Sequence, residues 1–190
     1  MNVTEVLKER HSVRDFSPQL VPDEVIDALL EKALQSPSWS NTQPYRVAVA
    51  NGDLTTRLAD AYARKFAAIS TLQRKPRWQQ FLWGTLQGSL PDGDFRPIHK
   101  YPAELHKRRV ATGVGLYTHL GIARHDHAAR DRQMARNFEF FGAPAALFLF
   151  VHEGLGVYSV LDAGIFLQSL MLAATAEGLC TCAQGALAMW

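Results

Sequence analysis

Cysteine is scarce in this sequence, and the spacing of the two that occur excludes the usual roles of paired thiols. Cys180 and Cys182 are the only cysteines among 190 residues, and one residue separates them. That spacing fits neither a zinc knuckle nor a redox CxxC pair. We therefore expect buried, reduced thiols and a cytoplasmic location, because reducing compartments keep thiols free.

Charge of one sign and long apolar runs are also lacking. The formal net charge is +2, from 20 Lys and Arg against 18 Asp and Glu. This balance gives no electrostatic reason to expect nucleic acid or an acidic membrane as a partner. The most apolar run, residues 143–151, is too short to cross a bilayer. Residues 1–5 lead into a charged amphipathic pattern rather than a signal peptide.

Hydrophobic periodicity predicts an α+β fold in a single domain over residues 1–190, with helices outnumbering strands. Apolar side chains recur at helical spacing after Pro22, where proline suits a first helical turn. Alternation after Tyr45 and the Asn51-Gly52 turn signal predict a strand. We expect helices at residues 4–10 (capped by Thr4), 22–34, 54–69 and 161–177, a mostly helical stretch at 110–137, and strands at 45–50, 145–152 and 179–182.

Two stretches depart from the ordinary pattern. Prolines and glycines interrupt residues 75–104, and so long an excursion is typical of a lid or an interaction segment. Its aromatic residues Trp78, Phe81 and Trp83 fit either core packing or the mouth of a substrate channel. Residues 161–177 are apolar nearly all round, which predicts a central helix or a subunit interface.

Arg10-His11-Ser12-Val13-Arg14 is the first candidate binding segment. Guanidinium groups match phosphate oxygens in geometry, and a serine hydroxyl adds a donor, so the segment can hold a phosphate. On these residues alone, two solvated arginines beside a turn remain the commoner interpretation.

Residues 37–44, Pro-Ser-Trp-Ser-Asn-Thr-Gln-Pro, form the second candidate segment, between a helix and a strand. The amides of Asn41 and Gln43 both donate and accept, which fits the pyrimidine edge of a flavin with its alternating donors and acceptors. A capping and turn segment is the plainer interpretation of the same composition.

Five motifs in this order resemble those of the FMN-dependent nitroreductase family. After the RxSxR cluster and the PSxxNxQP loop comes Gly-Ala-Pro at 142–144, just before an apolar strand. Asp162-x-Gly164 with Gln168 then lies in a helix that ends in Gly178-Leu179. Residues 101–104 and 136–141 are most similar to the branch that includes nitrobenzoate reductases.

This resemblance implies a dimeric α+β fold with an antiparallel-rich central sheet flanked by helices. It also implies a flavin site completed across a homodimer. The N-terminal cluster would contact the ribityl phosphate and the pyrimidine edge, and the 37–43 loop would reach the flavin from the other subunit. The backbone after Cys182 would donate to flavin N5. The implied FMN-binding residues are Arg10, His11, Ser12, Arg14, Pro37, Ser38, Trp39, Ser40, Asn41, Gln43, Asn137, Ala183, Gln184 and Gly185.

The implied activity is reduction of nitroaromatics or quinones, which are small aromatic substrates, with NADH or NADPH by ping-pong hydride transfer. The chemistry belongs to the flavin, so we expect no dedicated catalytic side chain. Arg14 is expected to supply positive charge beside the flavin ring.

Family members continue past this loop with a helix, a strand and a C-terminal arm that adds phosphate contacts. We expect that arm to be absent after Trp190. One alternative is therefore an FMN-binding protein with little or no turnover. Another is a structural or regulatory α+β domain that binds no flavin.

Other polar clusters are interpreted as surface or packing groups. His125-Asp126-His127, with His119, predicts a solvated face rather than a metal site, because histidines two apart do not share a helix face. Asp162 and Gln168 are expected to pack their helix rather than to take part in catalysis.

Overall fold

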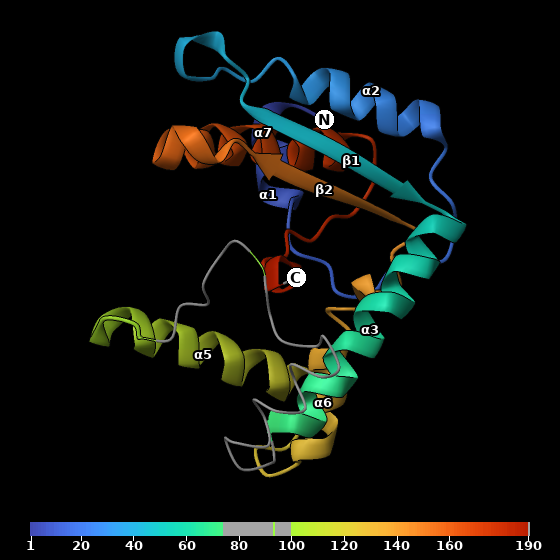
Figure 1. Ribbon diagram of the computed structural model, residues 1–190, viewed down its shortest axis with the longest axis vertical. Helices are drawn as coiled ribbons and strands as arrows, with labels where there is room; N and C mark the ends of the chain where they lie inside the picture. Colours follow the sequence, from blue (N-terminus) through green and yellow to red (C-terminus); the bar gives the residue numbers. More distant parts are fainter. Residues whose placement is uncertain (74–92, 94–99, 190) are drawn as a thin grey trace. The chain divides into compact units, whose positions relative to one another are not determined.

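A computed structural model of the chain describes residues 1–73, 93 and 100–189. The chain forms two compact units, and the colours of Figure 1, which follow residue number, locate the residues of each. The first holds residues 1–58 and 141–183, and the second holds residues 59–140 and 184–190. The expectation of a single domain stays a prediction. Trp78, Phe81 and Trp83 lie outside the described residues, with most of the 75–104 excursion.

The sheet of the first unit is an antiparallel pair of strands, β1 (Tyr45–Asn51) and β2 (Ala145–Val151). Tyr45 pairs with Val151, and the register holds to the other end of both strands. The face that carries Tyr45 packs into the core, whereas Phe150 on the other face is exposed. Both expected strands are confirmed to within one residue, because alternation and the turn signal after β1 mark their ends.

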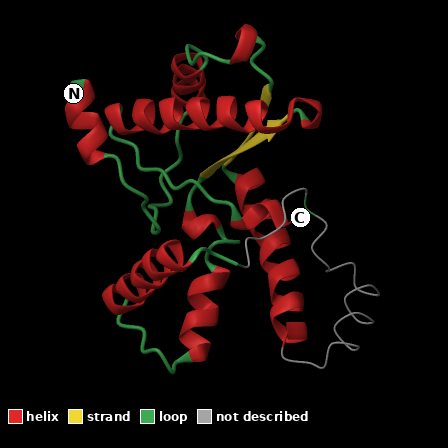
Figure 2. Cartoon of the chain, turned by 90° about the vertical axis from the view of Figure 1, so that its left-hand side faces the viewer, coloured by secondary structure: helices red, strands yellow, loops and turns green. Residues whose placement is uncertain are grey.

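Two helices, α2 (Asp23–Ala33) and α7 (Gly156–Ala176), pack against the core face of this sheet. Phe166 of α7 lies against Tyr45 of β1, with 4.6 Å between ring centroids. Figure 2 shows how small a share of the chain the sheet takes beside the helices, so the α+β class is confirmed. The buried core consists of Leu29, Ala33, Tyr45, Phe166, Leu170 and Ala174.

The helix α7 begins earlier and is more open than its sequence pattern predicts. It begins at Gly156, which adopts a left-handed φ of 54°. The hydroxyl of Ser159 donates to the carbonyl oxygens of Gly156 and His152 and secures this first turn. Phe166 lies on the buried face, but Leu161 is 59% exposed. A central helix buried on all sides within the chain is therefore wrong, and the alternative of a subunit interface stays a prediction.

The apolar stretch that bears on membrane crossing is Glu153–Ala176 rather than residues 143–151. By length and composition alone it is long and apolar enough to cross a bilayer. The same test is passed by core helices of globular domains, and α7 places Ala163, Phe166 and Leu170 in the core of its unit. One face of this helix therefore belongs to the core of its unit.

The first helix, α1 (Val3–Glu9), is capped by Asn2 rather than by Thr4. The Asn2 side chain accepts from the Glu5 amide at 3.0 Å, and the Glu5 carboxylate accepts from the Asn2 amide at 2.8 Å. This reciprocal capping box satisfies two amides that the first helical turn leaves free. The Thr4 cap is therefore wrong by two residues.

The second unit is helical in its described part. The helix α3 (Asp53–Gln73) begins in the first unit and continues into this one, followed by α5 (Ala103–His119) and α6 (His127–Ala135). The expectation that residues 110–137 are mostly helical is confirmed, but two helices share the stretch, because Gly121 adopts a left-handed φ of 66° and Asp126 caps a new helix. Short 3-10 turns lie at Trp39–Asn41, Phe140–Gly142, Glu153–Leu155 and Ala186–Met189.

Candidate functional site

The N-terminal arginine cluster lies beside the segment that follows α7. Ser12 and Thr181 form a parallel bridge, and the Val13 amide donates to the Thr181 carbonyl oxygen at 3.0 Å. This single bridge replaces the strand expected at 179–182, which is wrong at that length. Two segments from opposite ends of the sequence, both expected to contact one flavin, thus lie side by side in the first unit.

The side chains at this bridge divide between two faces. In an extended segment, successive side chains point to opposite sides. His11 and Val13 line a hollow of about 490 Å³ together with Glu9 and Cys180. The His11 Nδ1 atom lies 2.7 Å from the Glu9 carbonyl oxygen. His11 is thus on the side opposite to Ser12, and its part in flavin binding stays a prediction.

The two cysteines differ in exposure, and the expectation that both are buried is wrong. Cys180 is exposed, because it lies in the irregular segment after the helix end at Gly178, whereas Cys182 is half-buried. Burial raises the pKa of the Cys182 thiol, and the positive charge of Arg14 partly opposes that rise. Arg14 therefore lies close enough to the 181–183 segment for its charge to act there.

The 37–43 loop is held by its own hydrogen bonds. The Gln43 amide donates to the Ser38 hydroxyl at 2.8 Å, and the Gln43 side chain donates to the Leu34 carbonyl oxygen at 3.1 Å. Ser40, Asn41 and Gln43 have φ values of 51°, 55° and 45°. Left-handed conformations are unfavourable for residues with a side chain, although asparagine tolerates them. The loop therefore has a defined and strained shape.

Side chains of α7 contact and hold this loop. Both carboxylate oxygens of Asp162 lie 3.1 Å from the Trp39 amide nitrogen, and the Trp39 ring lies against Tyr158 with 4.7 Å between centroids. Two helical turns further along α7, the Ser169 hydroxyl accepts a hydrogen bond of 2.7 Å from the Ser36 hydroxyl. Sequence reasoning missed this role of Asp162. The available signal was that Asp162 is the one charged residue between Gly156 and Ala176.

The structure brings together only part of the predicted site within one protomer. The 37–43 loop is anchored at Asp162, near the start of α7, while the Ser12–Thr181 bridge follows its end. At 1.5 Å per residue, about 20 Å of helix separates the two places. Asn137, Gln184 and Gly185 belong to the second unit. Their part in the site stays a prediction.

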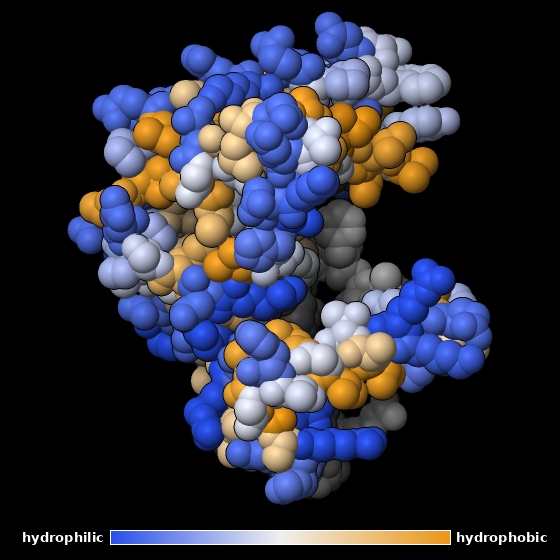
Figure 3. Space-filling model, turned by 180° about the vertical axis from the view of Figure 1, so that it is seen from behind, coloured by the Kyte–Doolittle hydropathy of each residue, from blue (hydrophilic) through white to orange (hydrophobic). Residues whose placement is uncertain are grey.

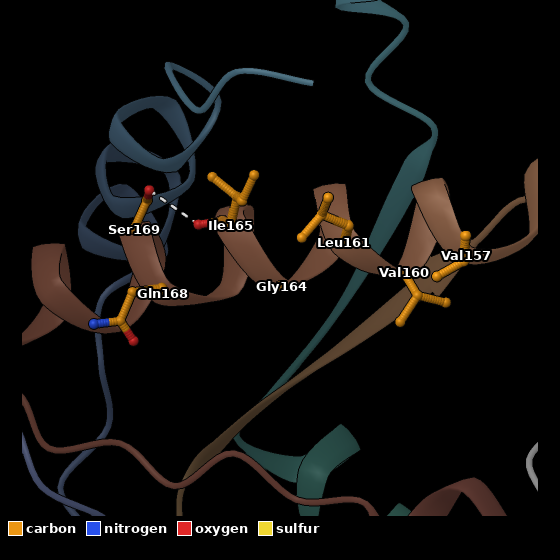
Figure 4. A pocket seen from close by; sticks show the side chains of 7 residues that line it. All are labelled: Val157, Val160, Leu161, Gly164, Ile165, Gln168 and Ser169. Carbon is orange, nitrogen blue, oxygen red and sulfur yellow. Dashed lines mark hydrogen bonds between the residues drawn. The ribbon is translucent and has the colours of Figure 1, made fainter. Parts of the chain in front are cut away.

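An apolar face of α7 is open along its length. Figure 4 shows side chains along this face of the helix, which borders a shallow groove of about 600 Å³. Val157 is 75% exposed and Leu161 is 59% exposed. Figure 3 shows further apolar side chains at the surface of the same unit. The groove is lined by Val157, Val160, Leu161, Gly164, Ile165, Gln168 and Ser169.

No metal centre is found among the residues that the structure describes. Within them, no three His, Cys, Asp or Glu side chains lie close enough to hold an ion. In the His125–His127 segment, the Asp126 carboxylate accepts from the Ala129 amide at 2.9 Å. That carboxylate therefore serves as a helix cap, because it satisfies a free amide of the first turn.

Comparison with known protein families identifies the family of this chain. The family model described as the nitroreductase family matches residues 7–189. The chain belongs to the nitroreductase family. Among family members, the nitroreductase NfnB of Mycolicibacterium smegmatis is 33% identical over 185 residues, covering 97% of this chain and 71% of that protein. The 4-nitrobenzoate reductase of Pseudomonas putida is 33% identical over 188 residues, covering 94% and 70%.

Solved nitroreductases share the fold as well. The FMN-dependent nitroreductase NfnB from Mycobacterium smegmatis in complex with NADPH matches with a TM-score of 0.82 and 32% identity, over 98% of this chain and 75% of that one. The FMN- and NADPH-dependent NfnB from Sphigopyxis sp. strain HMH matches with a TM-score of 0.80. The chain spans 66% of the 4-nitrobenzoate reductase of Nocardioides sp., so it matches only part of some relatives.

The contrast between the two thiols gives a pH-dependent prediction. We expect iodoacetamide to alkylate the exposed Cys180 first. Because the pKa of Cys182 is raised, less of it is thiolate at a given pH, so its rate of alkylation should rise only at higher pH than for an ordinary thiol. Peptide mass spectrometry across a pH series measures both rates.

Arg14→Gln tests the part that the positive charge of Arg14 has in the Cys182 pKa. It should shift the Cys182 profile to still higher pH, because Arg14 lowers the Cys182 pKa. Equal rates at both thiols in the native protein, with the same pH profile, would show that the burial of Cys182 is wrong.

Proposed function

We propose that this chain is an FMN-dependent oxidoreductase that reduces nitroaromatics or quinones with NADH or NADPH. The observation that carries the proposal is the bridge between Ser12 and Thr181. It joins two segments that the sequence motifs assign to the same flavin. The relatives add weight, because solved structures at 32% identity are named FMN- and NADPH-dependent nitroreductases.

The groups beside this bridge fit the polar part of FMN. In the part of the chain that the structure describes, the side chains of Arg10, Ser12 and Arg14 have no hydrogen-bond partner. The Thr181 hydroxyl is buried and also lacks a partner there. Two guanidinium groups and two hydroxyls suit a phosphate and a ribityl chain, which need charge-assisted and neutral donors. These donors are free to take such a ligand.

Each segment has a role in this proposal. Bound FMN supplies a ring that takes a hydride from NAD(P)H and passes it to an electron-poor aromatic substrate. Arg10 and Ser12 hold the phosphate and ribityl groups, and Arg14 places a positive charge that favours an electron-rich ring. The backbone of residues 183–185 would offer an amide donor to the ring. The 37–43 loop would hydrogen-bond the pyrimidine edge of the flavin through the side-chain amides of Asn41 and Gln43.

We further propose that the site is completed across a homodimer. The 37–43 loop and the Ser12–Thr181 bridge lie toward opposite ends of α7, and the open apolar face of α7 lies between them. Two α7 helices packed antiparallel about a two-fold axis would bring the start of each to the end of its partner. An exposed apolar face of this kind is typical of an interface. Each loop would then meet the partner's arginine cluster.

The direct test is reconstitution with FMN. We expect the purified protein to retain flavin absorption after desalting, to bleach with NADPH in the absence of oxygen, and to regain colour when 4-nitrobenzoate is added. Protein that stays colourless after incubation with FMN would contradict the proposal and favour a domain without flavin. Flavin that binds but does not bleach would indicate a flavin-binding protein without turnover.

Arg14→Ala should weaken FMN binding and slow turnover. Loss of one charge-assisted contact costs about 1.5–3 kcal/mol, which is roughly a ten- to hundred-fold rise in Kd. The reduction potential of the bound flavin should also fall, because a positive charge is removed. Fluorescence titration and anaerobic redox titration measure the two effects. Arg46→Ala, on the open face of β1, is the matched control and should change neither.

Leu161→Lys should convert the dimer to a monomer. Leu161 lies in the open groove of α7, and a lysine there would place two like charges across the two-fold interface. Light scattering after gel filtration measures the mass, and FMN affinity should fall with it. Leu105→Lys, at a similarly exposed leucine of α5, is the control. A native protein that is already monomeric when FMN is bound would contradict this arrangement.

A further inference from the structure

We propose that Asp162 is a positioning residue: its carboxylate fixes the 37–43 loop through the Trp39 amide and so prepares that loop to hold the flavin. The inference rests on the function proposed above for this loop. Asp162 itself is assigned no contact with the cofactor and acts through the backbone that it holds.

Asp162 is a buried carboxylate in the first unit. Its side chain is 4% exposed, and both of its oxygens lie 3.1 Å from the Trp39 nitrogen. No lysine, arginine or histidine pairs with it among the residues in the described ranges. A buried carboxylate without a cationic partner is costly, and an apolar side chain of similar volume is commonly as stable or more stable. Stability alone therefore does not explain an aspartate here.

The loop that Asp162 holds contains a left-handed turn. Ser40, Asn41 and Gln43 adopt left-handed φ values, which need outside support to persist. The bonds from Gln43 to Ser38 and Leu34 close the loop on itself and on the end of α2. The Trp39–Asp162 hydrogen bond is the polar link that ties the left-handed turn to α7. It sets where Asn41 and Gln43 lie.

Tyr45, a polar neighbour of Asp162, does not compete with Trp39 for its carboxylate. The nearby Tyr45 hydroxyl is buried and has no hydrogen-bond partner in the described part of the chain. Burial raises the pKa of Tyr45, and the negative charge of Asp162 raises it further, so the two groups are close enough to interact. Tyr45 nevertheless makes no hydrogen bond to the carboxylate. The carboxylate accepts its hydrogen bond from the Trp39 amide instead.

The test compares variants in the FMN-free protein, so that the loop is measured apart from the cofactor. Asp162→Leu removes the acceptor and keeps the branched shape of the side chain, and Asp162→Asn keeps one acceptor oxygen. We expect hydrogen exchange of the 38–44 peptides to rise about ten- to hundred-fold in Asp162→Leu, as for loss of a hydrogen bond to a charged acceptor, and far less in Asp162→Asn. The midpoint of urea unfolding should change little. FMN Kd should rise with the exchange rate.

A second pair of variants tests the donor. Trp39→Ala keeps the amide and removes the ring, whereas Trp39→Pro removes both. Proline suits this place, because Ser38 before it is extended, with φ of −140° and ψ of 161°. Exchange and FMN Kd should rise more in Trp39→Pro than in Trp39→Ala. This pair decides the matter if Asp162→Leu fails to fold.

The outcomes separate this inference from the proposed function. Unchanged exchange in Asp162→Leu, or equal effects of Trp39→Pro and Trp39→Ala, would overturn the anchoring role. Raised exchange with unchanged FMN affinity would overturn the link to flavin binding. If the native protein binds no FMN while Asp162→Leu loosens the loop, the proposed function fails and the anchoring role stands.

Discussion

The packing of Phe166 on Tyr45 is the contact on which the first unit depends. Phe166 is 1% exposed and Tyr45 is 8% exposed, and together they fix α7 against the sheet. Once α7 is fixed, Asp162 near its start holds the 37–43 loop, and the chain leaving its end reaches the arginine cluster. Polar groups of this kind are placed accurately only by rigid elements. The hydrophobic core thus determines the geometry of a polar site.

The parts of the fold that sequence analysis predicts well are those with a local signal. Alternating apolar residues and the Asn51-Gly52 turn mark β1 closely. Helix ends are predicted poorly, because they depend on single side chains and backbone conformations. The Asn2 capping box moves the first helix, the left-handed Gly156 begins α7 early, and Gly121 interrupts the expected helical stretch at 110–137. Periodicity, which averages over many residues, does not detect such local features.

The candidate site divides in the same way. Composition identifies the 10–14 and 37–44 segments, and the order of motifs identifies the family. The Ser12–Thr181 bridge could not be predicted from the residues alone, because a pairing between distant segments leaves no local pattern. The role of Asp162 was missed for a different reason. A lone charge in an apolar helix was visible in the sequence, but its partner is a backbone amide, and any residue except proline offers one.

The bridge between Ser12 and Thr181 also has a consequence for how the chain folds. It closes a loop that runs from residue 12 to residue 181, and pairings this distant in sequence are slow to form. During synthesis the arginine cluster therefore emerges long before Thr181 can pair with Ser12. This edge of the first unit is completed only after most of that unit has been made.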